Sequence, residues 1–151
     1  MRWSRGRADV DRLVEEGRLE RATGAAADGS SLLESAEGLL ASARRERDSN
    51  PEAAFVLAYD AARKASTALV AQQGLRTKSM GHHVTVEAVV RAQFGGPFDA
   101  FGGLRRRRSE IEYPQRPGDD IAPGEAQSAI TAAGQILDAA RQLLPQLDLY
   151  R

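Results

Sequence analysis

The chain contains no cysteine and few aromatic residues. None of its 151 residues is Cys, and Phe, Trp and Tyr together make up 5% of the sequence. The absence of thiols excludes disulfide bonds, thiolate metal sites and cysteine nucleophiles. It also fits the reducing environment of the cytoplasm, where we expect this protein to be located.

The sequence also has no excess of positive or negative charge and no long apolar run. Lys and Arg number 21, as do Asp and Glu, so the formal net charge at pH 7 is zero. Any binding of nucleic acid must therefore come from a local basic patch, because the whole molecule is no polycation. No apolar run approaches the roughly 18 residues of a membrane-spanning helix, and no signal-peptide core follows the basic residues 1–7. We expect no association with a membrane.

The apolar residues recur with the period of a helix. β-Branched residues occur only in short clusters such as 84–86, and no hairpin turn separates alternating runs. We predict an all-α bundle of four to five main helices, without a sheet, as a single domain over residues 8–151, preceded by a flexible N-terminus at residues 1–7. The predicted helices span residues 8–22, 30–48, 51–74, 84–94, 98–113 and 124–147.

Two of these helices carry the clearest patterns. Pro51 suits a first helical position, where its missing N–H is not needed. A stripe of small residues then follows at Ala54, Ala58, Ala61, Ala65 and Ala68. The last helix has a seam spaced alternately by four and three residues, at Ala126, Ile130, Ala133, Leu137, Ala140, Leu144 and Leu147. Such a seam either forms the internal core of one bundle or docks a partner.

The start of the second helix shows a capping pattern. Residues 24–29 are rich in Gly and Ala and are expected to form a loose connector. Ser30 and Ser31 can cap the helix that follows, and Glu34 stands three residues after Ser31.

Four consecutive arginines are the most conspicuous polar feature. Successive helical residues rotate by about 100°, so the four cannot face one way. The apolar stripe of this helix places Arg108 where the pattern expects a hydrophobic residue, and Glu112 is in position to pair with it. One interpretation is a solvated basic face with one structural arginine. The other is an anion site, because guanidinium groups bind phosphate in a bidentate manner. The run consists of Arg105, Arg106, Arg107 and Arg108.

Two smaller features also contain polar side chains. His82 and His83 are adjacent, which points their side chains apart, and no other His or Cys is present to complete a metal site. A structural role at the start of the next helix is the simpler interpretation. Tyr59, Arg63 and Ser66 share one helical face, which in isolation suggests surface pairing around a half-buried tyrosine.

The order of these motifs resembles the HEPN superfamily. The elements of the resemblance are Ala-Tyr-x-Ala-Ala-Arg at 58–63, Gly-Leu at 74–75, a His-containing loop, a short helix ending in Phe94, and Leu-x-x-x-Arg-x-x-x-x-Tyr at 104–113. A final amphipathic helix follows, and the resemblance covers residues 32–147.

The resemblance implies a helical bundle, often dimeric, and in many members a metal-independent ribonuclease of a toxin–antitoxin, CRISPR or other defence system. The family motif is an Arg followed after four to six residues by a His. Under this resemblance, Arg108 or Arg107 takes the place of the Arg and Tyr113 that of the His. Tyrosine has an ordinary pKa near 10, so it is a poor general base at neutral pH.

We therefore expect a HEPN-like domain that binds RNA or nucleotide phosphate and has a degenerate nuclease motif. Its expected phosphate-binding residues are Arg105, Arg106, Arg107, Arg108, His82 and His83, and its expected catalytic residues are Arg108 and Tyr113. No cofactor or metal is expected. The expected partners are a second copy of the chain and a nucleotidyltransferase-type antitoxin. The alternatives are an active endoribonuclease toxin and a non-catalytic scaffold for protein interaction.

Overall fold

The computed structural model describes residues 3–22, 24–78 and 82–151, apart from the side chain of His82. Within this part of the chain, helices dominate, and the only strands form a two-stranded sheet. The elements in chain order are α1 (Arg7–Glu15), β1 (Leu19–Arg21), η1 (Gly24–Ala26), α2 (Ser30–Glu46), α3 (Pro51–Gln72), β2 (Leu75–Thr77), α4 (His82–Gln93), η2 (Gly96–Ala100), α5 (Phe101–Glu112), α6 (Pro123–Leu143) and η3 (Leu144–Gln146).

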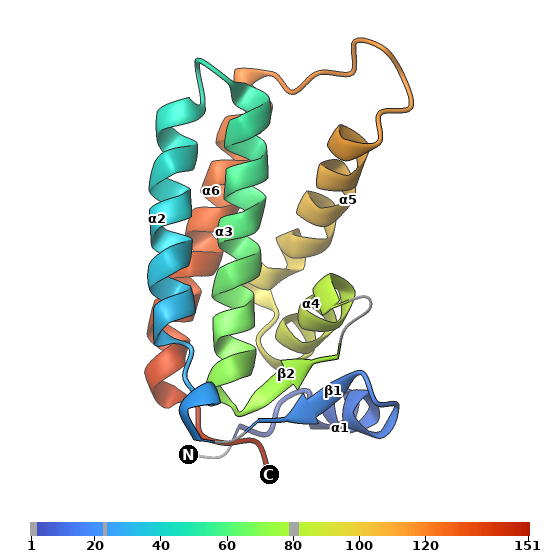
Figure 1. The fold of residues 1–151 in the computed structure, drawn as a ribbon, viewed down its shortest axis with the longest axis vertical. Coiled ribbons are helices and arrows are strands. Elements are labelled where there is room, and N and C mark those ends of the chain that lie inside the picture. The colour runs from blue at the N-terminus through green and yellow to red at the C-terminus, as the bar shows by residue number, and fades with distance from the viewer. Residues whose placement is uncertain (1–2, 23, 79–81) are drawn as a thin grey trace.

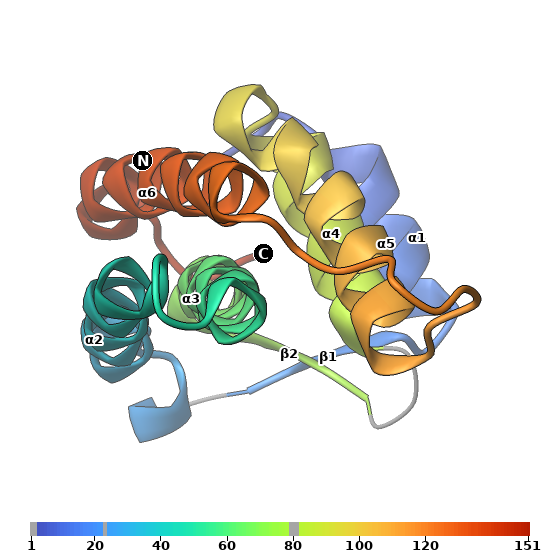
Figure 2. The ribbon, with the colours of Figure 1, turned by 90° about the horizontal axis from the view of Figure 1, so that it is seen from above.

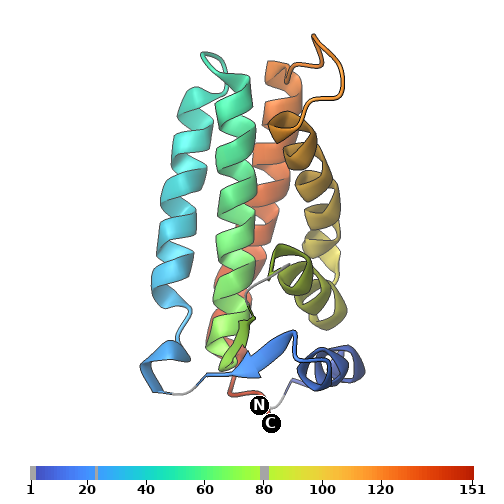
Figure 3. The same ribbon diagram turned by 45° about the vertical axis from the view of Figure 1, so that its right-hand side comes forward.

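Three long helices form the main body of the molecule. α2, α3 and α6 run alongside one another, and each contacts the other two (Figures 1 and 3). Seen from above, α4 and α5 lie on the side of α3 away from α2, and α1 lies beyond α4 (Figure 2). This arrangement confirms the all-α bundle predicted from the sequence. None of the described helices is long and apolar enough to cross a membrane.

Small side chains allow the long helices to approach one another closely. The side chain of Asn50 caps α3 by accepting a hydrogen bond from the amide of Ala53 at 3.1 Å, and Pro51 is the first residue of the helix. All five alanines of the predicted stripe are buried, and so is the seam of α6 except for the half-buried Leu144. Because α6 packs against α2 and α3, the seam forms the internal core of the bundle.

The first predicted helix is too long. α1 ends at Glu15, and Gly17 then adopts a φ of 74°, which favours glycine. The chain continues as β1, which pairs antiparallel with β2, between the predicted helices 51–74 and 84–94. The pairing buries Leu19 and Leu75, so the prediction of a bundle without a sheet was wrong in this region. The register places Leu19, Glu20 and Arg21 opposite Thr77, Arg76 and Leu75.

The starts of the other helices also differ from the prediction. The N-cap of α2 is Gly29 and no side chain caps it, so the predicted serine cap is wrong. Asp28 instead accepts a hydrogen bond from the amide of Ser30 at 2.8 Å. α4 begins two residues earlier than predicted, α5 begins after the 3₁₀ helix η2, and η3 takes the end of the last predicted helix. Residues 79–81, between the predicted helices 51–74 and 84–94, lie outside the described part of the chain.

The residues before α1 lie against the end of α4. The indole of Trp3 donates a hydrogen bond to the carbonyl of Gln93 at 3.0 Å, and its ring meets the ring of Phe94 edge-on at 5.1 Å. Trp3, in the segment predicted to be flexible, therefore contacts the C-terminal end of α4 in this structure.

Candidate functional site

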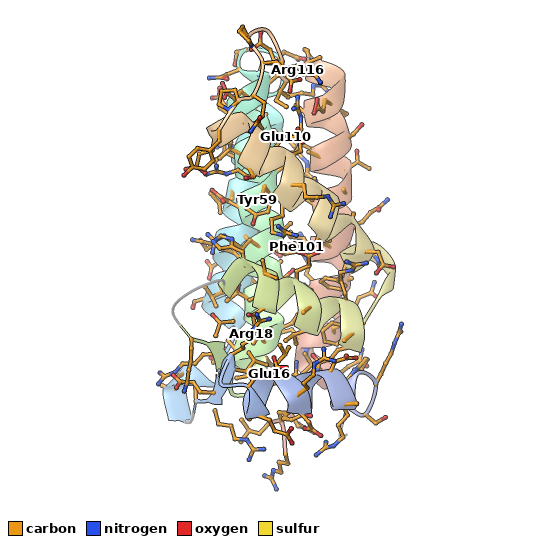
Figure 4. All side chains as sticks on the ribbon, turned by 90° about the vertical axis from the view of Figure 1, so that its right-hand side faces the viewer. Glu16, Arg18, Tyr59, Phe101, Glu110 and Arg116 are labelled. Carbon is orange, nitrogen blue, oxygen red and sulfur yellow. The ribbon has the colours of Figure 1, made fainter. Side chains whose placement is uncertain are left out.

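A polar cleft of about 420 Å³ opens between α3, α4 and α5. α3 contributes side chains from its middle, α4 from its first turn and α5 from Arg105 to its end. Figure 4 views the molecule from the side of α4 and α5 and labels Tyr59. The cleft is lined by Tyr59, Asp60, Arg63, His83, Arg105, Arg108, Ser109 and Glu112.

The four consecutive arginines divide between two sides of α5. Arg105 and Arg108 are three residues apart, so they share a face and both line the cleft. Arg108 Nη1 lies 2.6 Å from Glu112 Oε2, which confirms the predicted i,i+4 pair. Arg106 is exposed, lies outside the cleft, and has no ion pair within the described part of the chain.

Arg107 ties the end of α5 to the loop and helix that follow. Its guanidinium lies 2.5 Å from Glu125 Oε1, and 2.9 Å from both Asp119 Oδ2 and Glu110 Oε2. Hydrogen bonds to Asp119, Glu125 and Glu110 raise the pKa of Arg107 further above its ordinary value. Its donors are engaged by carboxylates outside the cleft, so its role in the structure is to fix the connection between α5 and α6.

Tyr113 lies away from the cleft. It follows the last residue of α5, its backbone amide bonds to the carbonyl of Ser109, and 68% of the residue is exposed. It is not among the residues that line the cleft beside Arg108. The pattern Arg-x-x-x-x-Tyr led us to expect Arg108 and Tyr113 at one site. The structure does not bring these two side chains together in this cleft.

A histidine does enter the cleft. His83 Nδ1 lies 2.9 Å from the hydroxyl of Tyr59, and the two rings are stacked at 6.2 Å. Tyr59 in turn meets Phe101 edge-on at 5.9 Å, so the pair rests on the core (Figure 4). Burial raises the pKa of Tyr59 above its ordinary value, against the opposing charges of the nearby arginines. The phenol is thus neutral at physiological pH. The side chain of His82 lies outside the described residues.

Arg63 brings a third guanidinium into the cleft from α3. Its Nε is buried and has no hydrogen-bond acceptor among the described residues, and its closest carboxylate, Asp60, is 3.9 Å away. The sequence indicated that Tyr59 and Arg63 share a helical face, but it suggested a surface pairing with a half-buried tyrosine. Tyr59 is instead 4% exposed. Its near-complete burial by α5 could not be predicted from α3 alone.

A buried carboxylate holds Arg105 from behind the cleft. Glu87 of α4 is 6% exposed, and its Oε2 lies 2.7 Å from Arg105 Nε while its Oε1 lies 3.4 Å from Arg91 Nη1. The carboxylate lies so close to α5 that a Cβ atom at Gly102 would be 2.4 Å from Oε1. The close approach explains a glycine at position 102, in the first turn of the helix that carries the site, and it is a contact that the sequence did not reveal.

The two glycines of α5 are expected to respond oppositely to alanine. Gly102→Ala should lower the free energy of unfolding by about 1–2 kcal/mol, because the new methyl group must displace the Glu87 carboxylate from Arg105. Gly103→Ala should raise it by about 0.5–1 kcal/mol, because its Cβ would meet only the end of the Arg106 side chain, at 3.9 Å. Urea unfolding followed by circular dichroism measures both. Equal changes in the two variants would contradict the role given to Glu87.

The chemistry of the cleft is that of an anion site. Three guanidiniums face two carboxylates, Asp60 and Glu112, and Glu112 is half-exposed, so that a stronger anion can replace it on Arg108. Within the described ranges, no group of three or more His, Asp or Glu residues is arranged to hold a metal ion. The chain matches no family model, no curated protein and no solved structure.

Proposed function

We propose that the cleft binds a phosphate group of RNA or of a nucleotide. The observation that carries the proposal is the convergence of Arg63, Arg105 and Arg108 from two helices on one open cleft, with a buried donor of Arg63 left without an acceptor. Burying an N–H without an acceptor costs free energy. The Arg63 side chain is still 24% exposed, so its guanidinium can meet a ligand in the cleft. A phosphate has enough oxygens to accept hydrogen bonds from several guanidiniums at once.

The setting of this activity is part of the same proposal. The resemblance of residues 32–147 to the HEPN superfamily supports a toxin–antitoxin or defence system, a homodimer and a nucleotidyltransferase-type protein partner. The basic cleft supports the binding function itself, because it contains two members of the arginine run together with the Arg of the 58–63 motif.

Arg108→Ala is expected to lower the affinity for RNA about tenfold, because it removes one charge-assisted contact to phosphate. The measurement is a gel shift with a mixed RNA pool in EDTA at two salt concentrations. Arg12→Ala is the matched control, because Arg12 also faces a glutamate at i+4, on α1 and outside the cleft. Binding that is unchanged in Arg108→Ala, or equally weakened in Arg12→Ala, would refute the proposal. A stable complex with another protein that forms equally well with both variants would favour the scaffold function.

A second candidate function is metal-independent cleavage of RNA. The observation that favours it is the imidazole of His83 in the same cleft as Arg105 and Arg108, with Tyr59 holding one of its ring nitrogens. Histidine titrates near neutral pH and can assist attack of a 2′-hydroxyl on phosphorus, as the 5′-oxygen leaves. The same RNA pool tests this candidate. Cleavage in EDTA that is lost in His83→Ala and kept in Tyr113→Phe would support it, and an intact pool would leave binding alone.

A further inference from the structure

A second hollow of about 400 Å³ lies directly beyond Arg105. One wall is an apolar face of α4, formed by residues spaced four apart so that they share one side of the helix. The first of these, Val84, is 46% exposed, which is unusual for a large aliphatic side chain on this protein. The apolar wall consists of Val84, Ala88 and Ala92.

Arg105 belongs to both hollows. It lines the cleft together with Arg63 and Arg108, and it also lines the hollow beside α4. Glu87, which lines the second hollow, fixes its guanidinium at 2.7 Å from the α4 side. A side chain held in this way is already ordered before a ligand arrives, so little conformational entropy remains to be lost on binding.

Another cation lines the second hollow. Arg91 pairs with Glu87 at 3.4 Å and with Asp99 at 3.6 Å, and about half of its side chain is exposed. Guanidiniums therefore line both hollows, at Arg63 and Arg108 in the cleft, at Arg105 between the two, and at Arg91 in the second hollow. Each carboxylate that lines one of the two hollows is within 4 Å of one of these arginines. These carboxylates belong to Asp60, Glu87, Asp99 and Glu112.

We infer that the cleft and the hollow form one track for single-stranded RNA of at least two nucleotides. The inference rests on the proposed function and extends it from one phosphate to a strand. Successive phosphates would contact the arginines on either side of Arg105, and one base would lie on the apolar wall of α4. A base can reach such a wall only when it is unstacked, which favours a single strand over a duplex.

Competition binding tests the inference. The probe is fluorescein-labelled hexauridylate, and the competitors are unlabelled hexauridylate, UMP and a 12-base-pair RNA duplex. We expect hexauridylate to bind at least tenfold more tightly than UMP and more tightly than the duplex. Arg91→Ala should lower the affinity for hexauridylate about tenfold and leave that for UMP unchanged. It should also reduce the slope of affinity against salt by about 0.7, the value for one lost phosphate contact on a single strand.

The control variant is Arg141→Ala on α6. Arg141 has an exposure similar to that of Arg91 and pairs with two carboxylates, but it lies outside both hollows. Equal affinity for UMP and hexauridylate, equal competition by the duplex, or equal effects of the two arginine variants would overturn the inference. In any of these cases, UMP binding by the wild type that is lost in Arg108→Ala would still support the proposed phosphate site in the cleft. If neither UMP nor hexauridylate binds, the proposed function fails, and the track with it.

Discussion

An alanine at position 29 is expected to lower the free energy of unfolding by about 3 kcal/mol. Gly29 is buried where the connector before α2 crosses α3, and its Cβ would lie 2.1 Å from the carbonyl oxygen of Ala68 and 2.7 Å from its carbonyl carbon. Both are backbone atoms of a packed helix, near the C-terminal end of α3. They cannot rotate away as a side chain can, so the segment must shift.

The matched control is an alanine at position 38, in the exposed part of α2. A Cβ there meets nothing within 4 Å, so Gly38→Ala should raise the free energy of unfolding by about 0.5–1 kcal/mol. Urea unfolding of the two variants measures both changes. A Gly29→Ala protein as stable as the wild type would mean that the connector can leave α3 without cost, contrary to its hydrogen bond from the Gly29 amide to the Gln72 side chain at 3.0 Å.

Position 29 also shows what the sequence could not predict about the fold. The long helices were predicted because their signals are local: a proline after Asn50, and apolar residues at helical spacing. The connector 24–29 was predicted to be loose because Gly and Ala carry no local signal for packing. Its contact with Ala68 is set by tertiary structure. The strands β1 and β2 were missed for a related reason, because three residues are too few to show an alternating pattern.

The candidate site was predictable to a similar extent. The sequence pointed to the arginine run, to the pair of Arg108 with Glu112, and to Tyr59 and Arg63 on one face. It did not show that α3, α4 and α5 bring these residues together with His83, since neighbours in space are far apart in the chain. It showed that the four arginines cannot face one way, but it did not show that Arg107 contacts the carboxylates of Asp119 and Glu125.

Arg63→Ala is expected to have the largest effect on binding, a loss of about a hundredfold in affinity for hexauridylate. Arg63 offers a buried Nε that has no acceptor among the described residues, whereas Arg105 and Arg108 already donate to carboxylates at 2.7 and 2.6 Å. A phosphate oxygen bound to Arg63 therefore has no close internal acceptor to displace. A charge-assisted hydrogen bond contributes about 1.5–3 kcal/mol, and the upper part of this range corresponds to a hundredfold. Fluorescence competition measures the change.

The conservative variant separates charge from geometry. Arg63→Lys keeps the positive charge but loses the planar fork of the guanidinium. We expect its affinity for hexauridylate to be about a tenth of the wild-type value. Lys64→Ala is the neighbouring control, because Lys64 lies on the same helix but bonds to Ser35 at 2.9 Å and does not line the cleft. It should bind hexauridylate as the wild type does.

Stability provides the decisive second measurement for Arg63. Because its buried Nε lacks an acceptor, removing the guanidinium discards an unfavourable desolvation together with a long contact to Asp60 at 3.9 Å. The ligand-free Arg63→Ala protein should thus be as stable as the wild type or more stable, while it binds RNA far more weakly. A residue that lowers stability and raises affinity is typical of a binding site and not of a structural ion pair. If Arg63→Ala lost stability and bound RNA as the wild type does, Arg63 would have a purely structural role. The phosphate site would then depend on Arg105 and Arg108 alone.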